Sequence, residues 1–303
     1  MNSIAAGIVL YNPSDFVRFK KAFTSVVNQF PRVYVFDNST KAIKLPEKTS
    51  NLVYITEHKN MGIAYALNKI MKLASKDGFK WVVTMDQDSI VPDNLIDEYN
   101  KRLSIKNVGI ICPQVIDKRR IYQVPQDKIG DEYVNECITS GSCTSIEAWK
   151  NAGGFDEWLF IDLVDNDFCK RVILSGYKIL QINKIILNQE FGNITPKSLR
   201  IQNFWKRIAI LFHNENFAKL GYRKKVYPMR VYYTNRNIIY LNKKLKKYGG
   251  IGYKNYNVSS YCGFWIAFNL PSILRAKNKK DVIGAILSGI KSGRRKIVDE
   301  WEC

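Results

Sequence analysis

The stretch Trp81-Val-Val-Thr-Met-Asp86-Gln-Asp88 decides the predicted fold, because a largely apolar run ends in two carboxylates. Such a run is typical of a strand covered on both faces. Side chains two residues apart on extended backbone share a face, about 7 Å apart, so Asp86 and Asp88 could hold one ion and its ligand. Oxygen ligands without a nearby His or Cys favour Mg²⁺ or Mn²⁺. The alternative is a solvated loop with two surface aspartates.

Strand-like and helix-like segments alternate upstream of this stretch. Runs rich in β-formers predict strands at 4–10, 33–36 and 52–55, and apolar residues at helical spacing predict helices at 15–29 and 63–73. The alternation predicts an α/β fold with an open, mostly parallel sheet flanked by helices. Ligands of such sheets bind beyond the carboxyl ends of the strands. Polar clusters follow four predicted strands, and they begin at Tyr11, Asp37, His58 and Asp86.

Glycine-rich nucleotide motifs are missing from the sequence. No Gly-x-Gly-x-x-Gly follows the first predicted strand, and no Gly-x-x-x-x-Gly-Lys-Ser/Thr occurs anywhere. This disfavours a dinucleotide-binding Rossmann protein and a P-loop NTPase, and leaves a nucleotide site built from side chains open.

A second acidic cluster contains Asp162, Asp165 and Asp167, next to Phe160 and Phe168. A carboxylate in a partly apolar cleft can have its pKa raised enough to act as a general base. The alternative is that Asp162 or Asp165 caps the helix predicted to follow. Capping and catalysis are compatible, so we expect one aspartate for each.

The formal net charge of +20 is concentrated in the last third of the chain. Residues 1–194 contain 24 basic and 22 acidic side chains, whereas residues 195–303 contain 23 basic and only 5 acidic ones. This predicts a nearly neutral front part joined to a basic, mainly helical C-terminal region. That region could bind anionic lipid, could be a plain solvated surface, or could bind nucleic acid. The apolar segment 261–274 is too short to cross a bilayer and favours attachment to the membrane surface.

The chain start and the cysteines suggest a cytoplasmic protein. The first residues lack a basic region, so they predict a strand and not a signal peptide. The six cysteines form no Cys-x-x-Cys pair and are expected to be buried, reduced thiols. With only two histidines, a His/Cys zinc site is not expected.

The order of the motifs resembles that of the family-2 inverting glycosyltransferases with the GT-A fold. A later Arg230-x-Tyr-Tyr-x-x-Arg236-Asn motif is similar to one in bacterial rhamnosyltransferases of polysaccharide assembly. The resemblance covers roughly residues 4–240. It rests on five motifs: Asp37-Asn-Ser, Asn60-x-Gly62 with Asn68, Asp86-Gln-Asp88, Gly153-Gly-Phe-Asp-Glu157, and Asp165-x-Asp167-Phe-Cys-x-Arg171.

This resemblance implies a role for each candidate residue. Asp37 would read the base of the donor nucleotide, and Asn60 and Gly62 would complete its pocket. Asp86 would contact the ribose and Asp88 would bind the divalent ion, Mg²⁺ or Mn²⁺. The remaining implied roles are these: Asp165 as catalytic base, Arg236 with Arg230 on the leaving diphosphate, Tyr11 at the nucleotide sugar, and Asp162, Asp167 and Gln189 as additional candidates. Gln189 stands where the family often has a metal-binding His, and a neutral amide is the poorer ligand.

The sequence therefore predicts a metal-dependent inverting glycosyltransferase. The expected reaction moves rhamnose from dTDP-rhamnose to a lipid-linked oligosaccharide in cell-surface polysaccharide synthesis. The alternatives are a galactofuranosyl or other hexosyl transferase using a UDP-sugar and, from another class, a nucleic-acid-binding protein or a metal-dependent nucleotidyltransferase. Residues 1–240 would form the GT-A domain. Residues 241–303 would form a basic helical region on the anionic inner face of the cell membrane, with no nucleic acid bound.

Overall fold

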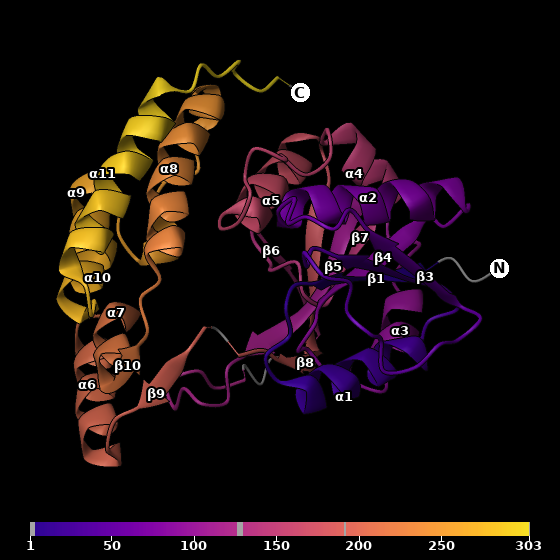
Figure 1. Cartoon of the computed structure of the whole chain (residues 1–303), viewed down its shortest axis with the longest axis horizontal. Helices are drawn as coiled ribbons and strands as arrows, with labels where there is room; N and C mark the ends of the chain where they lie inside the picture. Colours follow the sequence, from indigo (N-terminus) through magenta and orange to yellow (C-terminus); the bar gives the residue numbers. More distant parts are fainter. Residues whose placement is uncertain (1–3, 126–129, 191, 303) are drawn as a thin grey trace. The chain divides into compact units, whose positions relative to one another are not determined.

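The structure, a computed structural model, describes residues 4–125, 130–190 and 192–302. Its contacts divide the chain into two units. In Figure 1, where the colours follow the sequence, most of unit 1 is indigo to magenta and most of unit 2 is orange to yellow. Unit 1 contains the described residues up to 116 together with those of 125–189. Unit 2 contains residues 117–124 and the described part of 190–302.

Unit 1 is an α/β unit built on an eight-stranded sheet. The strand order is β3-β2-β1-β4-β7-β5-β8-β6, and the pairs among β1 to β4 and between β5 and β8 are parallel. The elements of unit 1 are β1 (Ile4–Leu10), α1 (Phe16–Val27), β2 (Val33–Asp37), β3 (Leu52–Thr56), α2 (Ile63–Lys76), β4 (Trp81–Asp86), α3 (Leu95–Asn100), β5 (Val108–Ile116), β6 (Asp131–Val134), β7 (Ser142–Ser145), α4 (Ile146–Asn151), α5 (Val164–Leu174) and β8 (Lys178–Asn188).

Helices cover both faces of this sheet, as Figure 1 shows. α2, α4 and α5 lie along one face, and α1 and α3 lie along the other. Phe19 and Phe23 of α1 and Tyr99 of α3 are fully buried against the strands. The apolar spacing that predicted α1 and α2 is therefore the stripe that each helix buries, and burial on both faces explains why the central strands β1, β2 and β4 are largely apolar.

Strand β1 places the polar strand ends next to one another. It pairs in parallel with β2 on one side and β4 on the other, with Leu10 opposite Asp37 and Val9 opposite Asp86. The carboxyl ends of these parallel strands lie at the same end of the sheet. The strand order reverses between β1 and β4, which makes this position a topological switch point. Ligands of open α/β sheets bind at such a switch point.

Unit 2 is mainly helical. Its elements are β9 (Ile194–Pro196), α6 (Leu199–Leu211), α7 (Glu215–Ala218), η1 (Lys219–Gly221), β10 (Tyr222–Lys224), α8 (Pro228–Lys244), η2 (Lys246–Tyr248), η3 (Lys254–Tyr256), α9 (Tyr261–Phe264), η4 (Trp265–Asn269), α10 (Leu270–Arg275) and α11 (Lys279–Arg295). α8 and α11 pack closely side by side. A Cβ on Gly289 or Gly293 would lie 2.5 Å from the carbonyl oxygen of Tyr232 or Arg236, so these two glycines allow the close approach.

The predicted fold class is confirmed, and each predicted element lies within a few residues of its observed bounds. The antiparallel strand β7, inserted between β4 and β5, was not predicted. The larger part of unit 2 begins at residue 190, and the boundary expected at residue 240 falls inside the continuous helix α8. The assignment of functions on either side of residue 240 stays a prediction.

Three cysteines are buried free thiols, as expected: Cys112, Cys143 and Cys169. Contrary to expectation, Cys137 is only half-buried and Cys262 is exposed. In α9 the buried side chain is that of Phe264, two residues after Cys262. Cys303 lies outside the described residues. Within 4–125, 130–190 and 192–302, no helix combines the length and the apolar composition needed to cross a bilayer.

Candidate functional site

The carboxyl end of β4 is tied to the carboxyl end of β1 by Gln87. Its side-chain oxygen accepts a hydrogen bond from the backbone N–H of Tyr11 (2.8 Å), and its side-chain nitrogen donates to the Tyr11 carbonyl (3.2 Å). Tyr11 itself is exposed, and Asp86 and Asp88 are half-buried. The Arg18 side chain of α1 donates to the Asp88 backbone carbonyl (2.8 Å). These bonds hold Tyr11, Asp86 and Asp88 together at the switch point of the sheet.

Gln189 belongs to a closed ring of hydrogen bonds around Asp86. Its side-chain nitrogen donates to Asp86 Oδ2 (2.9 Å), and its side-chain oxygen accepts from the Ser89 hydroxyl. Ser140 completes the ring, because its hydroxyl donates to Ser89 Oγ (3.0 Å) and accepts from the Asp86 N–H (3.2 Å). Ser89, Ser140 and Gln189 are all buried. Both ends of the Gln189 amide thus contact the protein, and the residue positions the Asp86 carboxylate.

Replacing Gln189 by Leu should weaken donor binding about 5- to 30-fold, since one to two net hydrogen bonds of about 1 kcal/mol each are lost around Asp86. Calorimetric titration with the donor nucleotide measures this. Gln181→Leu is the matched control and should bind normally, because Gln181 lies within β8, which ends one residue before Gln189, and its side chain bonds to Glu132 and Asn183. Equal affinities for both variants would show that the ring does not position Asp86.

Asp37 ends β2 and is completely buried. Its carboxylate accepts hydrogen bonds from the backbone N–H groups of Ser39 (2.9 Å) and Ile43 (2.8 Å) and from the Tyr54 hydroxyl (2.6 Å). Burial, followed by this contact with Asp37, raises the pKa of Tyr54, so the phenol stays protonated as a donor. In this structure Asp37 therefore orders the 38–43 loop; direct contact with a nucleotide base stays a prediction.

Asn60 and Gly62 form a turn that touches the second acidic segment. The Asn60 side chain accepts from the Gly62 N–H (3.0 Å), and Asn38 bridges Met61 and Gly62 through its amide. The Ile63 N–H at the start of α2 donates to the Phe160 carbonyl (2.9 Å). This bond joins the strand-end cluster to the segment that leads to Asp162 and Asp165.

Replacing Gly62 by Ala should destabilise the protein by about 2–5 kcal/mol, combining backbone strain and overpacking. The residue has a φ of 87°, and a Cβ would lie 2.8 Å from the Phe160 carbonyl oxygen. Gly78→Ala is the matched control, because Gly78 has a φ of 84° with nothing within 4 Å of the added carbon. Urea unfolding of both variants measures the extra loss at Gly62, which combines the Phe160 contact with the strain of a ψ of 165° at that residue, and equal losses would contradict it.

Asp165 lies in the first turn of α5, after a strained turn. Asp162 and Leu163 have φ values of 67° and 63°, a left-handed conformation that costs non-glycine residues about 1–3 kcal/mol each. Burial raises the pKa of Asp165 to about 7, with smaller increases from Cys137 and Asp162 and an opposing hydrogen bond from the Asn166 N–H. The dense protein around Asp165 desolvates its carboxylate. The residue is nevertheless only half-buried, so part of it stays accessible to solvent and to a substrate.

The expectation that an aspartate caps α5 was wrong. The N-cap residue is Leu163, and no side chain caps this helix end. Instead, the chain enters the helix through the left-handed turn at Asp162 and Leu163. Neither Asp162 nor Asp165 caps it.

Asp167 is a structural residue in this arrangement. It is completely buried and forms an ion pair with the buried Arg171 one turn later, which donates through Nε (3.0 Å) and Nη2 (2.5 Å). The Arg171 guanidinium also donates to the carbonyls of Ala152 and Gly154. The pair thereby fixes the Gly153-Gly154 turn against α5.

Asn68 holds the other side of that turn. From α2 it donates to the Phe155 carbonyl (2.8 Å) and to Glu157 (2.8 Å), and it accepts from the Trp149 indole (3.0 Å) and the Phe155 N–H (2.9 Å). The Gly153-Gly-Phe-Asp-Glu157 motif is therefore a turn locked by buried polar groups.

Arg230 and Arg236 belong to unit 2, on α8. Arg230 is exposed. Arg236 is buried, with its guanidinium 4.6 Å from the centre of the Tyr233 ring, and it donates from Nε to the Asn237 side chain (2.9 Å). Their proposed contact with a diphosphate stays a prediction.

Asp86 and Asp88 are the residues that fit a divalent ion. In the described part of the chain, no three His, Cys, Asp or Glu side chains converge to hold a metal by themselves. Mg²⁺ and similar ions are commonly bound by one or two carboxylates together with the phosphates of a substrate. The two aspartates fit an ion that arrives with a nucleoside diphosphate.

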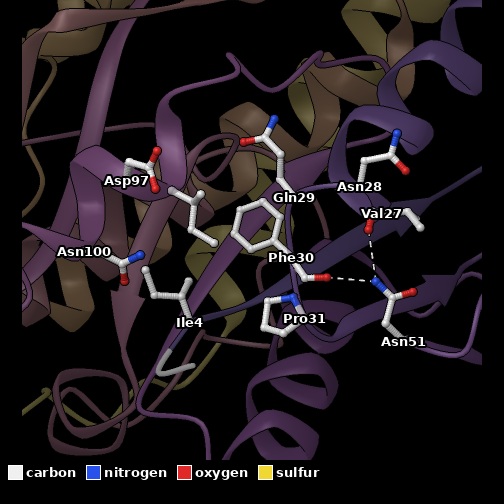
Figure 2. A pocket seen from close by; sticks show the side chains of 10 residues that line it. Ile4, Val27, Asn28, Gln29, Phe30, Pro31, Asn51, Asp97 and Asn100 are labelled. Atoms are coloured by element: carbon white, nitrogen blue, oxygen red, sulfur yellow. Dashed lines mark hydrogen bonds between the residues drawn. The ribbon is translucent and has the colours of Figure 1, made fainter. Parts of the chain in front are cut away.

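A cavity of about 390 Å³ lies at the opposite edge of the sheet (Figure 2). Ile4 and Pro31, which line it, lie at or just before the amino ends of β1 and β2. The Asn51 side chain beside it donates to the carbonyls of Val27 (3.0 Å) and Phe30 (2.8 Å). None of the candidate site residues lines this cavity, so it is separate from the strand-end cluster.

The sequence predictions did not include Gln87, Ser89 and Ser140 as functional residues. Gln87 is the spacer of the Asp86-Gln-Asp88 motif, and a polar spacer at a strand end is a usable signal. Ser140 lies 54 residues from Asp86 and reaches it only through the insertion of β7 beside β4. No local pattern could have revealed that contact.

The chain resembles several known proteins. Residues 6–125 match the family model of Glycosyl transferase family 2. Over this range the chain is similar to glycosyl transferase family 2. A dTDP-rhamnosyl transferase from Shigella flexneri, RfbF, is 28% identical to this chain over 263 residues, which cover 80% of the chain and 81% of the relative.

Two solved structures resemble the chain along most of its length. S. aureus TarS 1-349 is 15% identical with a TM-score of 0.47, and the alignment covers 96% of this chain and 89% of that one. The mannosyltransferase PcManGT from Pyrobaculum calidifontis, in complex with GDP-Man and Mn²⁺, is 13% identical with a TM-score of 0.48 and coverages of 97% and 87%.

Proposed function

We propose that the chain transfers rhamnose from dTDP-rhamnose, with inversion, to a lipid-linked oligosaccharide in cell-surface polysaccharide synthesis. The choice of sugar and nucleotide is supported by the similarity to a dTDP-rhamnosyl transferase. The observation that carries the chemistry is a reachable carboxylate, Asp165, with its pKa raised to about 7. The Phe160–Ile63 hydrogen bond joins its segment to the strand-end cluster.

The residues support a single displacement. Asp165 accepts the proton of the acceptor hydroxyl, the acceptor oxygen bonds to the anomeric carbon, and the bond from that carbon to the diphosphate breaks. Tyr11, Asn60 and Gly62 frame the nucleoside, with Asp37 ordering the loop behind it, and Asp86 meets the ribose. Arg230 and Arg236 are the proposed partners of the leaving diphosphate. A divalent ion on Asp88 would supply positive charge to the leaving group when bound.

The basic unit 2 supports a peripheral position on the anionic inner face of the cell membrane, where a lipid-linked acceptor would be available. Each Lys or Arg near such a surface contributes about 1 kcal/mol, so a few of them suffice for reversible attachment.

Purified protein tested against a panel of nucleotide sugars decides the donor. We expect nucleoside diphosphate release with dTDP-rhamnose in Mn²⁺ or Mg²⁺ and loss of release in EDTA, restored by adding the metal back. Preference for a UDP-hexose would correct the sugar and nucleotide. No binding or turnover of any nucleotide sugar would contradict the proposed activity as a whole.

A further inference from the structure

Helix α6 of unit 2 presents an apolar outer face that its own unit does not cover. Its inner face buries Gln202 and Ala209. Phe204 and Leu211 lie opposite the buried residues, Leu199 and Ile210 lie on one flank, and the C-cap residue Phe212 follows the helix; the exposed fraction of these five hydrophobic residues lies between 55% and 69%. Leaving several large apolar side chains exposed to water is unfavourable, so a partner that covers them is expected.

Cations lie within the same face. Arg200 and Phe204, like Arg207 and Leu211, are four residues apart, and at 3.6 residues per turn all four point to one side of the helix. The sequence has no Asp or Glu between Glu190 and Glu215. The outer face of α6 therefore combines large apolar side chains with an uncompensated positive charge.

This combination of positive charge and apolar side chains indicates which kind of partner covers the outer face of α6. A second copy of the chain would bring further arginines against Arg200 and Arg207 and would repel them. Nucleic acid would match the arginines but would leave Leu199, Ile210 and Leu211 without partners. A bilayer with anionic headgroups satisfies both, since the apolar side chains enter the interface while arginine stems extend to the phosphates.

The segment 261–274, expected from the sequence to lie in the interface, is only partly available for it. Phe264 is completely buried, stacked on Phe268 at 5.3 Å and packed against Tyr256 at 4.8 Å. Its aromatic side chains therefore belong to the packing of unit 2, and Leu270 and Leu274 remain exposed on its outer side.

We infer that α6 is a membrane-docking helix, lying in the plane of an anionic bilayer surface with Phe204 and Leu211 inserted. The inference rests on the proposed function, because a lipid-linked acceptor is what makes attachment useful. At 1.5 Å per residue a helix of this length is about 20 Å long, which suits a position in the interface and is too short to cross.

Flotation of the full chain with vesicles tests this, using phosphatidylcholine alone or with about one third phosphatidylglycerol. We expect binding to the anionic vesicles, and a decrease of at least about 10-fold for Phe204→Ser/Leu211→Ser. Leu270→Ser/Leu274→Ser is the matched control in the same unit. No binding of the unmodified chain, or a loss confined to the control, would overturn the inference.

Two further measurements separate the remaining outcomes. If light scattering shows a dimer that Phe204→Ser/Leu211→Ser converts to a monomer, a second copy covers α6 and the inference is wrong. Calorimetric titration with dTDP without vesicles should give the same affinity for the variant and the unmodified chain. Nucleotide binding without vesicle binding contradicts α6 docking alone, whereas vesicle binding without use of any nucleotide sugar contradicts the proposed function.

Discussion

Replacing Asp165 by Asn should lower the rate of sugar transfer about 10²–10⁴-fold, the usual contribution of a general base, while donor binding persists. The amide cannot take the proton of the acceptor hydroxyl, but it keeps the size and position of the carboxylate in the first turn of α5. Nucleoside diphosphate release under saturating donor measures the rate, and titration with the nucleotide measures binding. Near-normal turnover would remove Asp165 from the mechanism.

The pH dependence provides a second signature of the same residue. With the pKa of Asp165 raised to about 7, the base becomes active as the pH rises through that value, and the rate should increase to a plateau above it.

The free energy of unfolding should change with pH in the opposite direction to the rate. Between the unfolded-state pKa near 4 and the folded value, the folded state binds the extra proton, so stability falls as the pH rises. Asp165→Asn should therefore be at least as stable as the unmodified chain at pH 8, which excludes misfolding as the cause of inactivity. Asp93→Asn, at an exposed loop position, is the control.

Replacing Arg171 by Met should destabilise the protein by about 3–5 kcal/mol, because it leaves the buried Asp167 carboxylate without its counter-charge. The carbonyls of Ala152 and Gly154 lose their donor as well. Urea unfolding, followed by tryptophan fluorescence, measures the loss. Lys150→Met, on the exposed surface of α4, is the control and should change stability little.

The double variant Asp167→Leu/Arg171→Met distinguishes the charge pair from simple loss of packing. Removing both partners leaves no unpaired buried charge, so the double variant should be more stable than Arg171→Met alone. A double variant that loses the sum of both single effects would show that the two residues act independently. A small loss in Arg171→Met itself would contradict the structural role of the pair.

The strand-end residues were predictable because the relevant physics is local. An apolar run that stops at Asp86 marks a strand covered on both faces, and parallel strands bring their carboxyl ends to one edge. The chain positions of Tyr11, Asp37, Asn60 and Asp86 thus sufficed to expect them together. Their individual roles were not predictable in this way: Asp37 turned out to be fully buried, and its carboxylate is already occupied by two backbone N–H groups and Tyr54.

The second acidic cluster shows the opposite limit. Asp165 and Asp167 are two residues apart on one helix, and sequence spacing alone cannot say which is buried with a cation and which reaches solvent. That division depends on Arg171 folding back onto Asp167 and on the left-handed turn at Asp162 and Leu163. Likewise, the exposure of α6 and the burial of Phe264 depend on which helices pack against them in unit 2.

The sequence by itself determined the fold class of the front part, the edge of the sheet that carries the site, and the concentration of positive charge in the last third. Apolar periodicity and charge can be read directly from the sequence, because they do not depend on which segments pack together. Only the tertiary structure decided that Gln189 clamps Asp86, that Asp165 has a pKa raised to about 7, and that α6 presents the uncovered apolar face. Burial and hydrogen bonding between distant segments set each of these, and neither exists until the segments pack.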